Sequence, residues 1–160
     1  MTETKITAEP GIPQIVVTRH FSAPRELVFQ ACTDPELVKQ WLGPRRLETR
    51  FDCCEVRDGG RYRFVQWGED GQEHAFRGVY HGTPTPESTV RTFEYEGAPG
   101  HVMLETTVLE DSDGGTLMTG NSVFQSVADR DMMVTAGMDE GVYDSMDRLE
   151  ELLARLAPVS

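Results

Sequence analysis

The stretch between Arg45 and Phe124 constrains the fold most, because strand-like segments alternate there with short turn sequences. The segments contain β-branched and aromatic residues, and the breaks between them contain Gly, Pro, Asp and Ser, which favour turns. Breaks this short cannot hold crossover helices, so neighbouring strands are expected to be antiparallel. The sequence predicts six strands, over residues 46–57, 60–67, 72–82, 88–96, 101–110 and 115–124.

One further strand and two short helices precede this stretch. Gln14–Phe21 is predicted to be a strand because its first half is rich in β-branched residues. Ser22 suits the N-cap of a first helix. Asp34 and Pro35 suit the cap and the first position of a second helix, which a Gly-Pro pair ends.

Residues 130–156 carry apolar side chains at intervals of three and four, which predicts one amphipathic helix of about 40 Å. No other predicted element is long enough to cover the buried face of a sheet. The predicted fold class is therefore α+β. A curved antiparallel sheet of six to seven strands wraps around the long C-terminal helix, and two short helices follow the first strand. A twisted sheet of this kind tends to leave space between its concave face and the helix.

Small residues recur every fourth position on the predicted C-terminal helix, at Gly137, Gly141 and Ser145. They form one stripe of the helix. A glycine inside a helix costs about 1 kcal/mol relative to alanine, so two of them require a reason. Close packing of the helix on the sheet is one reason, and room for a ligand is the other. Both interpretations stay open at the level of sequence.

The net charge of −12 disfavours nucleic acid and anionic membrane surfaces as partners. The three cysteines do not have the spacing of a zinc site or a disulfide framework, and reduced thiols indicate the cytoplasm. No apolar run approaches the roughly 18 residues that a membrane span requires. Residues 1–13 are polar and contain Pro and Gly, which predicts a disordered lead-in before one domain over residues 14–157.

Aromatic and apolar side chains share faces of several predicted strands, because alternate residues of a strand point to the same side. A pocket wall built from them would be completed by side chains of the second and last helices. The alternative is that each of these residues is simply part of the core. The candidate ligand-binding residues are Trp41, Tyr62, Phe64, Phe76, Tyr80, Phe93, Tyr95, Met103, Gly137, Met138, Gly141 and Val142.

Several motifs resemble the SRPBCC or START-like superfamily, and more closely its branch of activator of heat-shock protein 90 ATPase homologues. The resemblance covers residues 14–156. It rests on Phe21-Ser22-Ala23-Pro24-Arg25-Glu26-Leu27-Val28-Phe29, Asp34-Pro35-Glu36-Leu37-Val38-Lys39-Gln40-Trp41, Asp58-Gly59-Gly60-Arg61-Tyr62-Arg63-Phe64, Gly78 with Pro86, Gly115-Thr116, and Gly137 with Asp147-Arg148-Leu149.

The resemblance implies a helix-grip fold that binds a small hydrophobic molecule between the sheet and the C-terminal helix. A cyclase or hydrolase acting in the same pocket is an alternative, as is a co-chaperone-like interaction domain, and a non-catalytic role is favoured over an enzyme. A protein partner or a homodimer also stays open. The chain departs from the branch at Met138, where tryptophan is common, and this affects the expected shape of the pocket.

Catalytic and metal-binding motifs are weak. The titratable candidates for acid–base chemistry are His74, Glu94, Glu105, Tyr62, Tyr80 and Tyr95. Asp111-Ser112-Asp113-Gly114 begins like a calcium loop but lacks the later bidentate acid, so a hairpin turn is expected. The sequence has no GxSxG and no HExxH. No catalytic residue, metal or cofactor is predicted.

Overall fold

A computed structural model describes residues 3–157 and shows one eight-stranded antiparallel sheet with four helices. Along the sheet the strands run in the order β1-β2-β8-β7-β6-β5-β4-β3. The elements are β1 (Lys5–Thr7), β2 (Gln14–Phe21), α1 (Arg25–Thr33), α2 (Pro35–Val38), β3 (Glu48–Cys54), β4 (Arg61–Trp67), β5 (Glu73–Val79), β6 (Ser88–Tyr95), β7 (Val102–Ser112), β8 (Gly115–Val123), α3 (Val127–Thr135) and α4 (Met138–Leu156).

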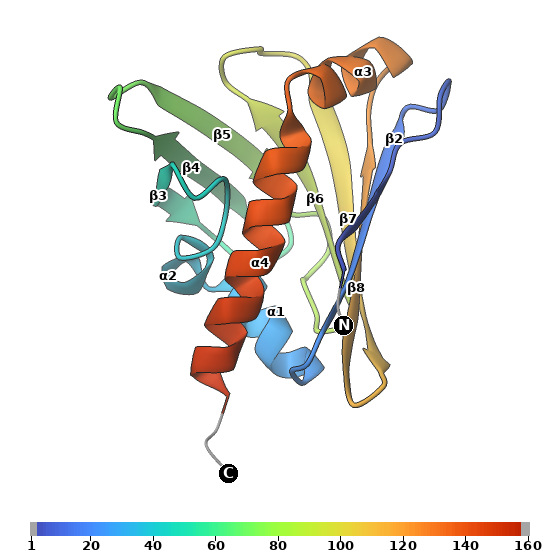
Figure 1. The fold of residues 1–160 in the computed structure, drawn as a ribbon. Helices are drawn as coiled ribbons and strands as arrows, with labels where there is room; N and C mark the ends of the chain where they lie inside the picture. Colours follow the sequence, from blue (N-terminus) through green and yellow to red (C-terminus); the bar gives the residue numbers. More distant parts are fainter. Residues whose placement is uncertain (1–2, 158–160) are drawn as a thin grey trace.

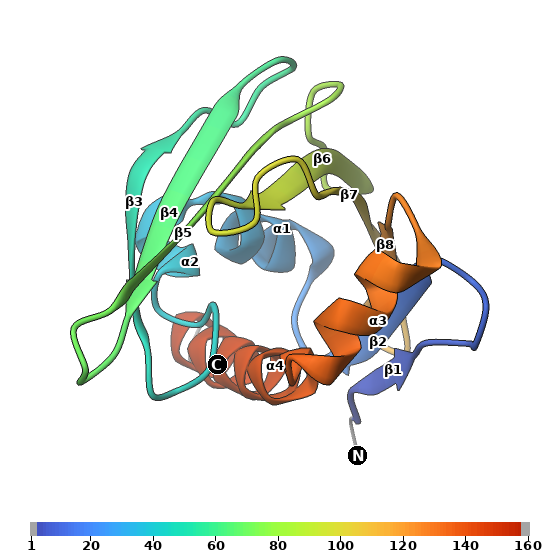
Figure 2. The same cartoon turned by 90° about the horizontal axis from the view of Figure 1, so that it is seen from above.

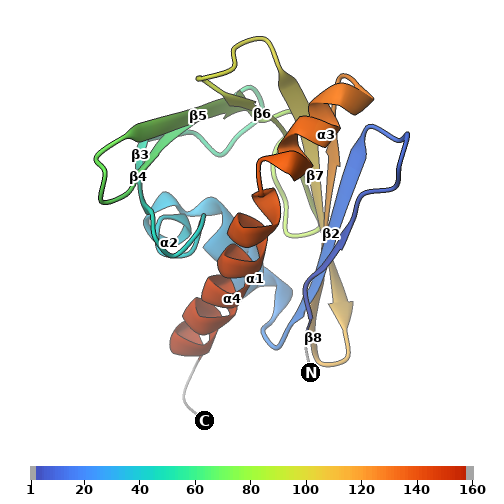
Figure 3. The same cartoon turned by 45° about the horizontal axis from the view of Figure 1, so that its top comes forward.

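The α+β fold class, with two short helices after β2 and a long C-terminal helix, is confirmed. Figures 1 and 2 show the sheet bent into a trough, with α4 across its open side and α1 and α2 at one end. This is the helix-grip arrangement. Figure 3 shows α3 set at an angle to α4 near the opposite end of the trough.

The sheet has one strand more than predicted, and this strand comes from the expected lead-in. Lys5–Thr7 form β1, which pairs with β2, so the prediction of disorder is wrong for these residues. Two arginines hold the segment in place: Arg19 donates to the hydroxyl of Thr4, and Arg130 donates to the carbonyl of Glu9. The polar composition of this segment predicted disorder wrongly, because the unpaired backbone groups at the edge of β2 can form hydrogen bonds with a strand of almost any sequence.

The two short helices begin close to their predicted positions. Asp34 caps α2, accepting a hydrogen bond from the Glu36 amide at 3.0 Å, and Pro35 is its first residue. Ser22 does not cap α1, because Pro24 stands at the N-cap and makes no side-chain hydrogen bond there. The cap of α2 therefore follows the local rule, while α1 depends on its buried residues Val28 and Ala31.

The predicted single helix over residues 130–156 is wrong, because the chain forms two helices joined at Gly137. Ser126 caps α3, accepting a hydrogen bond from the Asp129 amide at 3.1 Å. Gly137 has a φ of 82°, in the left-handed region, and this ends the helical path before α4 begins. The 19 residues of α4 span about 28 Å.

The core consists of three apolar clusters instead of one continuous interior. The largest joins α1, α2 and α4 to the nearby ends of the sheet and includes Leu149 and Phe21, both fully buried. A second surrounds Ile15 and Phe124 below α3. The third consists of aromatic side chains of β4 and its neighbours. Between the clusters, the middle of the concave face carries side chains that are only partly buried.

Candidate functional site

A chain of aromatic rings crosses the concave face over β3 to β6. Phe64 lies at its centre, with ring centroids 5.4 Å from Phe51, 5.0 Å from Phe76 and 6.3 Å from Phe93. The chain continues from Phe76 to Tyr95 at 5.2 Å. Phe64 is buried, whereas Phe76, Phe93 and Tyr95 are half-buried. Solvent therefore reaches one side of this aromatic surface.

An ion pair lies on the same face, next to the rings. Arg91 lies on the same face of β6 as Phe93 and Tyr95. Its Nε donates a hydrogen bond to the Glu105 carboxylate of β7 at 2.8 Å. The guanidinium lies 4.4 Å from the ring centroid of Tyr62. Arg91 and Glu105 retain 24% and 23% side-chain exposure, which shows that solvent reaches them between the sheet and the helices.

The groups around Arg91 hold their protons tightly. Burial raises the pKa of Tyr62, and it also raises the pKa of Tyr80, although Arg91 opposes both shifts. The Tyr62 hydroxyl donates to the carbonyl oxygen of Thr92. Both phenols are therefore neutral near pH 7, and the arginine and the glutamate supply the charges of this region.

A close backbone approach positions the Tyr62 ring. Gly78 of β5 is opposite Tyr62 of β4 in the sheet. A Cβ at Gly78 would overlap the carbonyl oxygen of Thr92 and would lie 2.6 Å from the Tyr62 hydroxyl oxygen. The missing side chain lets Tyr62 lie across β5 and reach β6, where it supports Arg91.

Small residues line the concave face beside the ion pair. Gly120 and Ser122 of β8 share this face with Met118, and Thr107 of β7 is directly opposite Gly120. Gly120, Ser122 and Thr107 are half-buried. A Cβ added at Gly120 would have only the Val17 carbonyl oxygen near it, at 3.9 Å. The sheet therefore provides open space here.

The small-residue stripe of the C-terminal helix does not provide that space. Ser145 accepts a hydrogen bond from the Gly43 amide at 2.7 Å, and a Cβ at Gly141 would be 3.6 Å from Pro44. Arg148, one turn further along α4, donates to the Gly43 carbonyl. Close packing, one of the two interpretations left open by the sequence, explains Ser145, but the element that packs there is the loop after α2 and not the sheet. At Gly141 a methyl group would make ordinary van der Waals contact with Pro44.

The predicted ligand-binding residues divide among three environments. Tyr62, Phe64, Phe76, Tyr80, Phe93 and Tyr95 come together on the aromatic surface of the concave face. Met103 and Met138 belong to the cluster below α3, and Val142 packs against the largest cluster. Trp41 is buried in that cluster and donates its indole N–H to the Ala31 carbonyl, so it ties α2 to α1. Gly137 separates α3 from α4, and Gly141 faces Pro44.

The other titratable candidates do not form a catalytic group with the ion pair. His74 Nδ1 and the Tyr95 hydroxyl are 2.9 Å apart at the far end of the aromatic chain. Glu94 pairs with Arg77 and accepts from the Gly100 amide. Of the carboxylates proposed from sequence, Glu105 is the one that faces inward. Residues 3–157 contain no group of three or more His, Cys, Asp or Glu side chains that could hold a metal ion.

The sequence profile of the family described as "Activator of Hsp90 ATPase homolog 1-like protein" matches residues 22–154. The chain belongs to this family. The match confirms the resemblance seen in the sequence, since it runs from before α1 into the last turn of α4. No curated protein matches the chain.

Solved structures agree with the family assignment at the level of the fold. Protein Ms6760 from Mycobacterium smegmatis is 19% identical, with a TM-score of 0.85 over 100% of this chain and 99% of that one. A protein from Rhodobacter sphaeroides is 25% identical, with a TM-score of 0.86 over 97% and 100%. A solution structure of an Arthrobacter aurescens protein is 22% identical, with a TM-score of 0.87 over 94% and 91%.

The sequence did not predict two inward-facing arginines, Arg19, which pairs with Asp147 and Glu150 of α4, and Arg91. The position of Arg91 in the sequence could have revealed it. Arg91, Phe93 and Tyr95 are two residues apart on one strand, so the alternation that places the aromatic residues inward also places Arg91 inward. A charged residue on an aromatic face contradicts the usual rule for the interior. Only the opposing register, which brings Glu105 directly across from Arg91, explains it.

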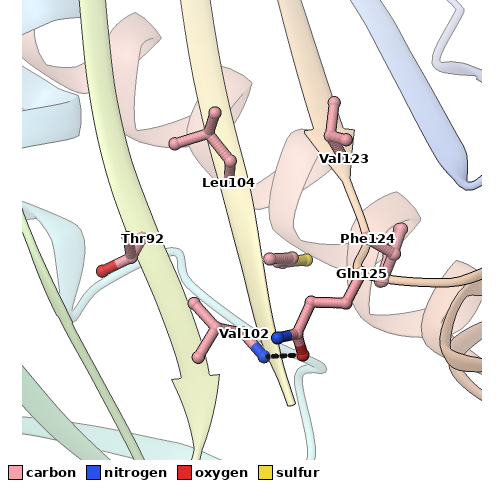
Figure 4. A pocket seen from close by; sticks show the side chains of 7 residues that line it. Thr92, Val102, Leu104, Val123, Phe124 and Gln125 are labelled. Carbon is pink, nitrogen blue, oxygen red and sulfur yellow. Dashed lines mark hydrogen bonds between the residues drawn. The ribbon is translucent and has the colours of Figure 1, made fainter. Parts of the chain in front are cut away.

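A hollow of about 300 Å³ lies on the outer face of the sheet, away from the aromatic surface. In Figure 4, Leu104 and Val123 stand side by side on neighbouring strands, with Thr92 on the next strand and Gln125 at the rim. The side-chain Oε1 of Gln125 accepts a hydrogen bond from the Val102 amide at 3.0 Å. A smaller hollow of about 120 Å³ lies along β1 and β2.

Across residues 3–157, no helix has the length and apolar character that crossing a membrane would need.

Proposed function

We propose that this protein binds a small hydrophobic molecule on the concave face of its sheet, beneath α4. The observation that carries the proposal is the half-buried state of Phe76, Phe93 and Tyr95 on the same concave face that carries the open space at Gly120. Aromatic side chains on an inner face are normally covered by packing, and a ligand that covers them removes apolar surface from water.

The fold supports the proposal because the close contacts between α4 and the sheet lie toward one end of the helix, where Arg19 of β2 pairs with Asp147 and Glu150. α4 packs against α1 and α3, and its stripe of small residues receives the loop containing Gly43 and Pro44. The largest core cluster thus fixes one end of α4, while the middle of the sheet opposite it carries Gly120, Thr107 and Ser122. Ligand sites of small proteins commonly combine such an apolar wall with a few polar groups.

Filling the space at Gly120 tests the proposal. The neutral fluorescent probe N-phenyl-1-naphthylamine is titrated into the wild type and into Gly120→Leu. We expect the probe to bind the wild type with increased fluorescence, and the leucine to weaken binding by about tenfold or more because it occupies the ligand's volume.

Two controls accompany this experiment. Gly120→Ala adds a single methyl group where there is room for it, and Thr119→Leu places the same side chain on the outer face of β8. Both should bind the probe as the wild type does, and circular dichroism checks that every variant is folded. Wild-type protein that does not bind, or Gly120→Leu protein that binds normally, would refute a site on the concave face.

A further inference from the structure

We infer that the ligand is a ring compound bearing a neutral hydroxyl group, which the Arg91–Glu105 pair binds while the aromatic surface covers the ring. This inference rests on the proposed function and adds the chemical class of the ligand. It follows from an ion pair on the same half-buried face as the aromatic chain, with no other ion pair among the described residues involving either partner.

The Arg91–Glu105 pair lies next to Phe93 in the sheet. Arg91 and Phe93 lie on the same face of β6. On β7, Glu105 is directly opposite Arg91 and Met103 is directly opposite Phe93. Phe93 is the residue where the aromatic cluster meets the cluster below α3. A ring lying against Phe93 therefore has the charged atoms of Arg91 and Glu105 within reach at one edge.

Both members of the pair keep hydrogen-bonding capacity for a ligand. A guanidinium has five N–H donors, of which Glu105 takes the Arg91 Nε–H and the Tyr80 hydroxyl takes a further one. A carboxylate accepts in about four directions, and Arg91 is the hydrogen-bond partner that the described residues give to Glu105. A hydroxyl group is both a donor and an acceptor, so a single ligand oxygen can accept from Arg91 and donate to Glu105.

The charges of the pair determine which head group the site favours. Arg91 and Glu105 carry opposite charges, so the site as a whole is neutral. An anionic ligand would gain the arginine but would also face the glutamate, and it would lose its own hydration in a poorly solvated region. A cationic ligand would gain the glutamate but would be repelled by the arginine. The pair therefore favours a neutral head group over a charged one.

A matched series of ligands tests the inference in the wild-type protein. Naphthalene, 1-naphthol and 1-naphthoate share one ring system and differ in the head group. Titrations followed by NMR or calorimetry at pH 7 should give 1-naphthol about tenfold tighter binding than naphthalene, because hydrogen bonds to charged groups discriminate strongly. 1-Naphthoate should bind more weakly than 1-naphthol.

The variant Glu105→Gln reverses the expected order. It removes the negative charge, leaves Arg91 without its counter-ion, and keeps the shape of the side chain, so 1-naphthoate should become the tighter ligand by about tenfold. Glu110→Gln is the matched control, since Glu110 is an exposed residue of the same strand on the outer face. It should keep the wild-type order. A merely structural role for Glu105 would weaken all three ligands alike.

The outcomes separate the two proposals. Naphthalene and 1-naphthol binding equally well to the wild type would refute the hydroxyl-binding role of the pair and leave the hydrophobic site intact. Failure of all three compounds to bind would refute both. The wild-type series does not depend on the variant, so the inference remains testable even if Glu105→Gln folds poorly.

Discussion

At the scale of single residues, Gly78 makes the most demanding contact of the concave face. We expect Gly78→Ala to destabilise the protein by about 3 kcal/mol, because the new methyl group would overlap the Thr92 carbonyl and the Tyr62 ring. Chemical denaturation measures the change. Gly120→Ala is the matched control, since it makes the same change in a strand with open space around it, and it should be neutral or slightly stabilising. Equal losses in the two variants would contradict this explanation.

The three cysteines should differ sharply in reactivity. Burial raises the pKa of Cys32 to about 12, and burial also raises the pKa of Cys54, whereas Cys53 is exposed. The thiolate is the reactive form, so the two shifted thiols react slowly. With iodoacetamide at pH 8, mass spectrometry should show one rapidly modified residue, Cys53, in the native protein and three in guanidinium chloride.

Cys53→Ser provides the check on this assignment. The rapid modification should disappear in that variant, and the slow modification should be unchanged. Cys32 being labelled as quickly as Cys53 in native protein would contradict the burial of its thiol.

At the scale of elements, the junction between α3 and α4 depends on one backbone conformation. Gly137 has a φ of 82°, and nothing lies within 4 Å of the position its Cβ would take. Gly137→Ala should therefore cost about 1 kcal/mol from the left-handed backbone alone. Gly137→Asn is the control, because asparagine tolerates this region better and should lose less stability. Thermal unfolding compares the variants, and an alanine variant as stable as the wild type would show that the two helices merge.

At the scale of the whole molecule, acid stability should depend on the ion pairs of the outer surface. A hydrogen bond from Arg63 lowers the pKa of Glu96, and a hydrogen bond from Arg45 lowers the pKa of Glu151. A carboxyl with a lowered pKa in the folded state stabilises above its unfolded value of 4.5, and this stabilisation is lost as the pH falls through the folded pKa. The loss should therefore begin near pH 4.5 and continue below it.

Acid also reduces the charge repulsion of a protein whose net charge is −12, which changes its stability separately. Removing one paired carboxyl isolates the contribution of its ion pair from that general effect. Glu96→Gln should lower the melting temperature at pH 7, and its difference from the wild type should shrink below about pH 4.5. Glu69→Gln serves as the control, because Glu69 is exposed and has no ion-pair partner within residues 3–157. Melting curves of Glu96→Gln and wild type that stay equally far apart at every pH would contradict the linkage.

The sequence by itself determined the features that depend on local pattern. Turn chemistry and alternation located six strands within a few residues of their ends, and Asp34 and Pro35 located the start of α2. The order of elements then restricted the fold to a sheet that wraps a C-terminal helix. These features follow from backbone conformations and periodicities that each segment carries in its own residues.

Only the tertiary structure decided which segments contact one another and where a regular element is interrupted. The helical periodicity ran through Gly137, so the break there could be seen only in the backbone conformation. The stripe of Gly141 and Ser145 meets the loop after α2, a partner about a hundred residues away in sequence. Arg91 and Glu105 face one another because the strand register places them side by side, and cross-strand register is a property of two segments together. Contacts between distant segments depend on the arrangement of the whole chain, and no local pattern encodes them.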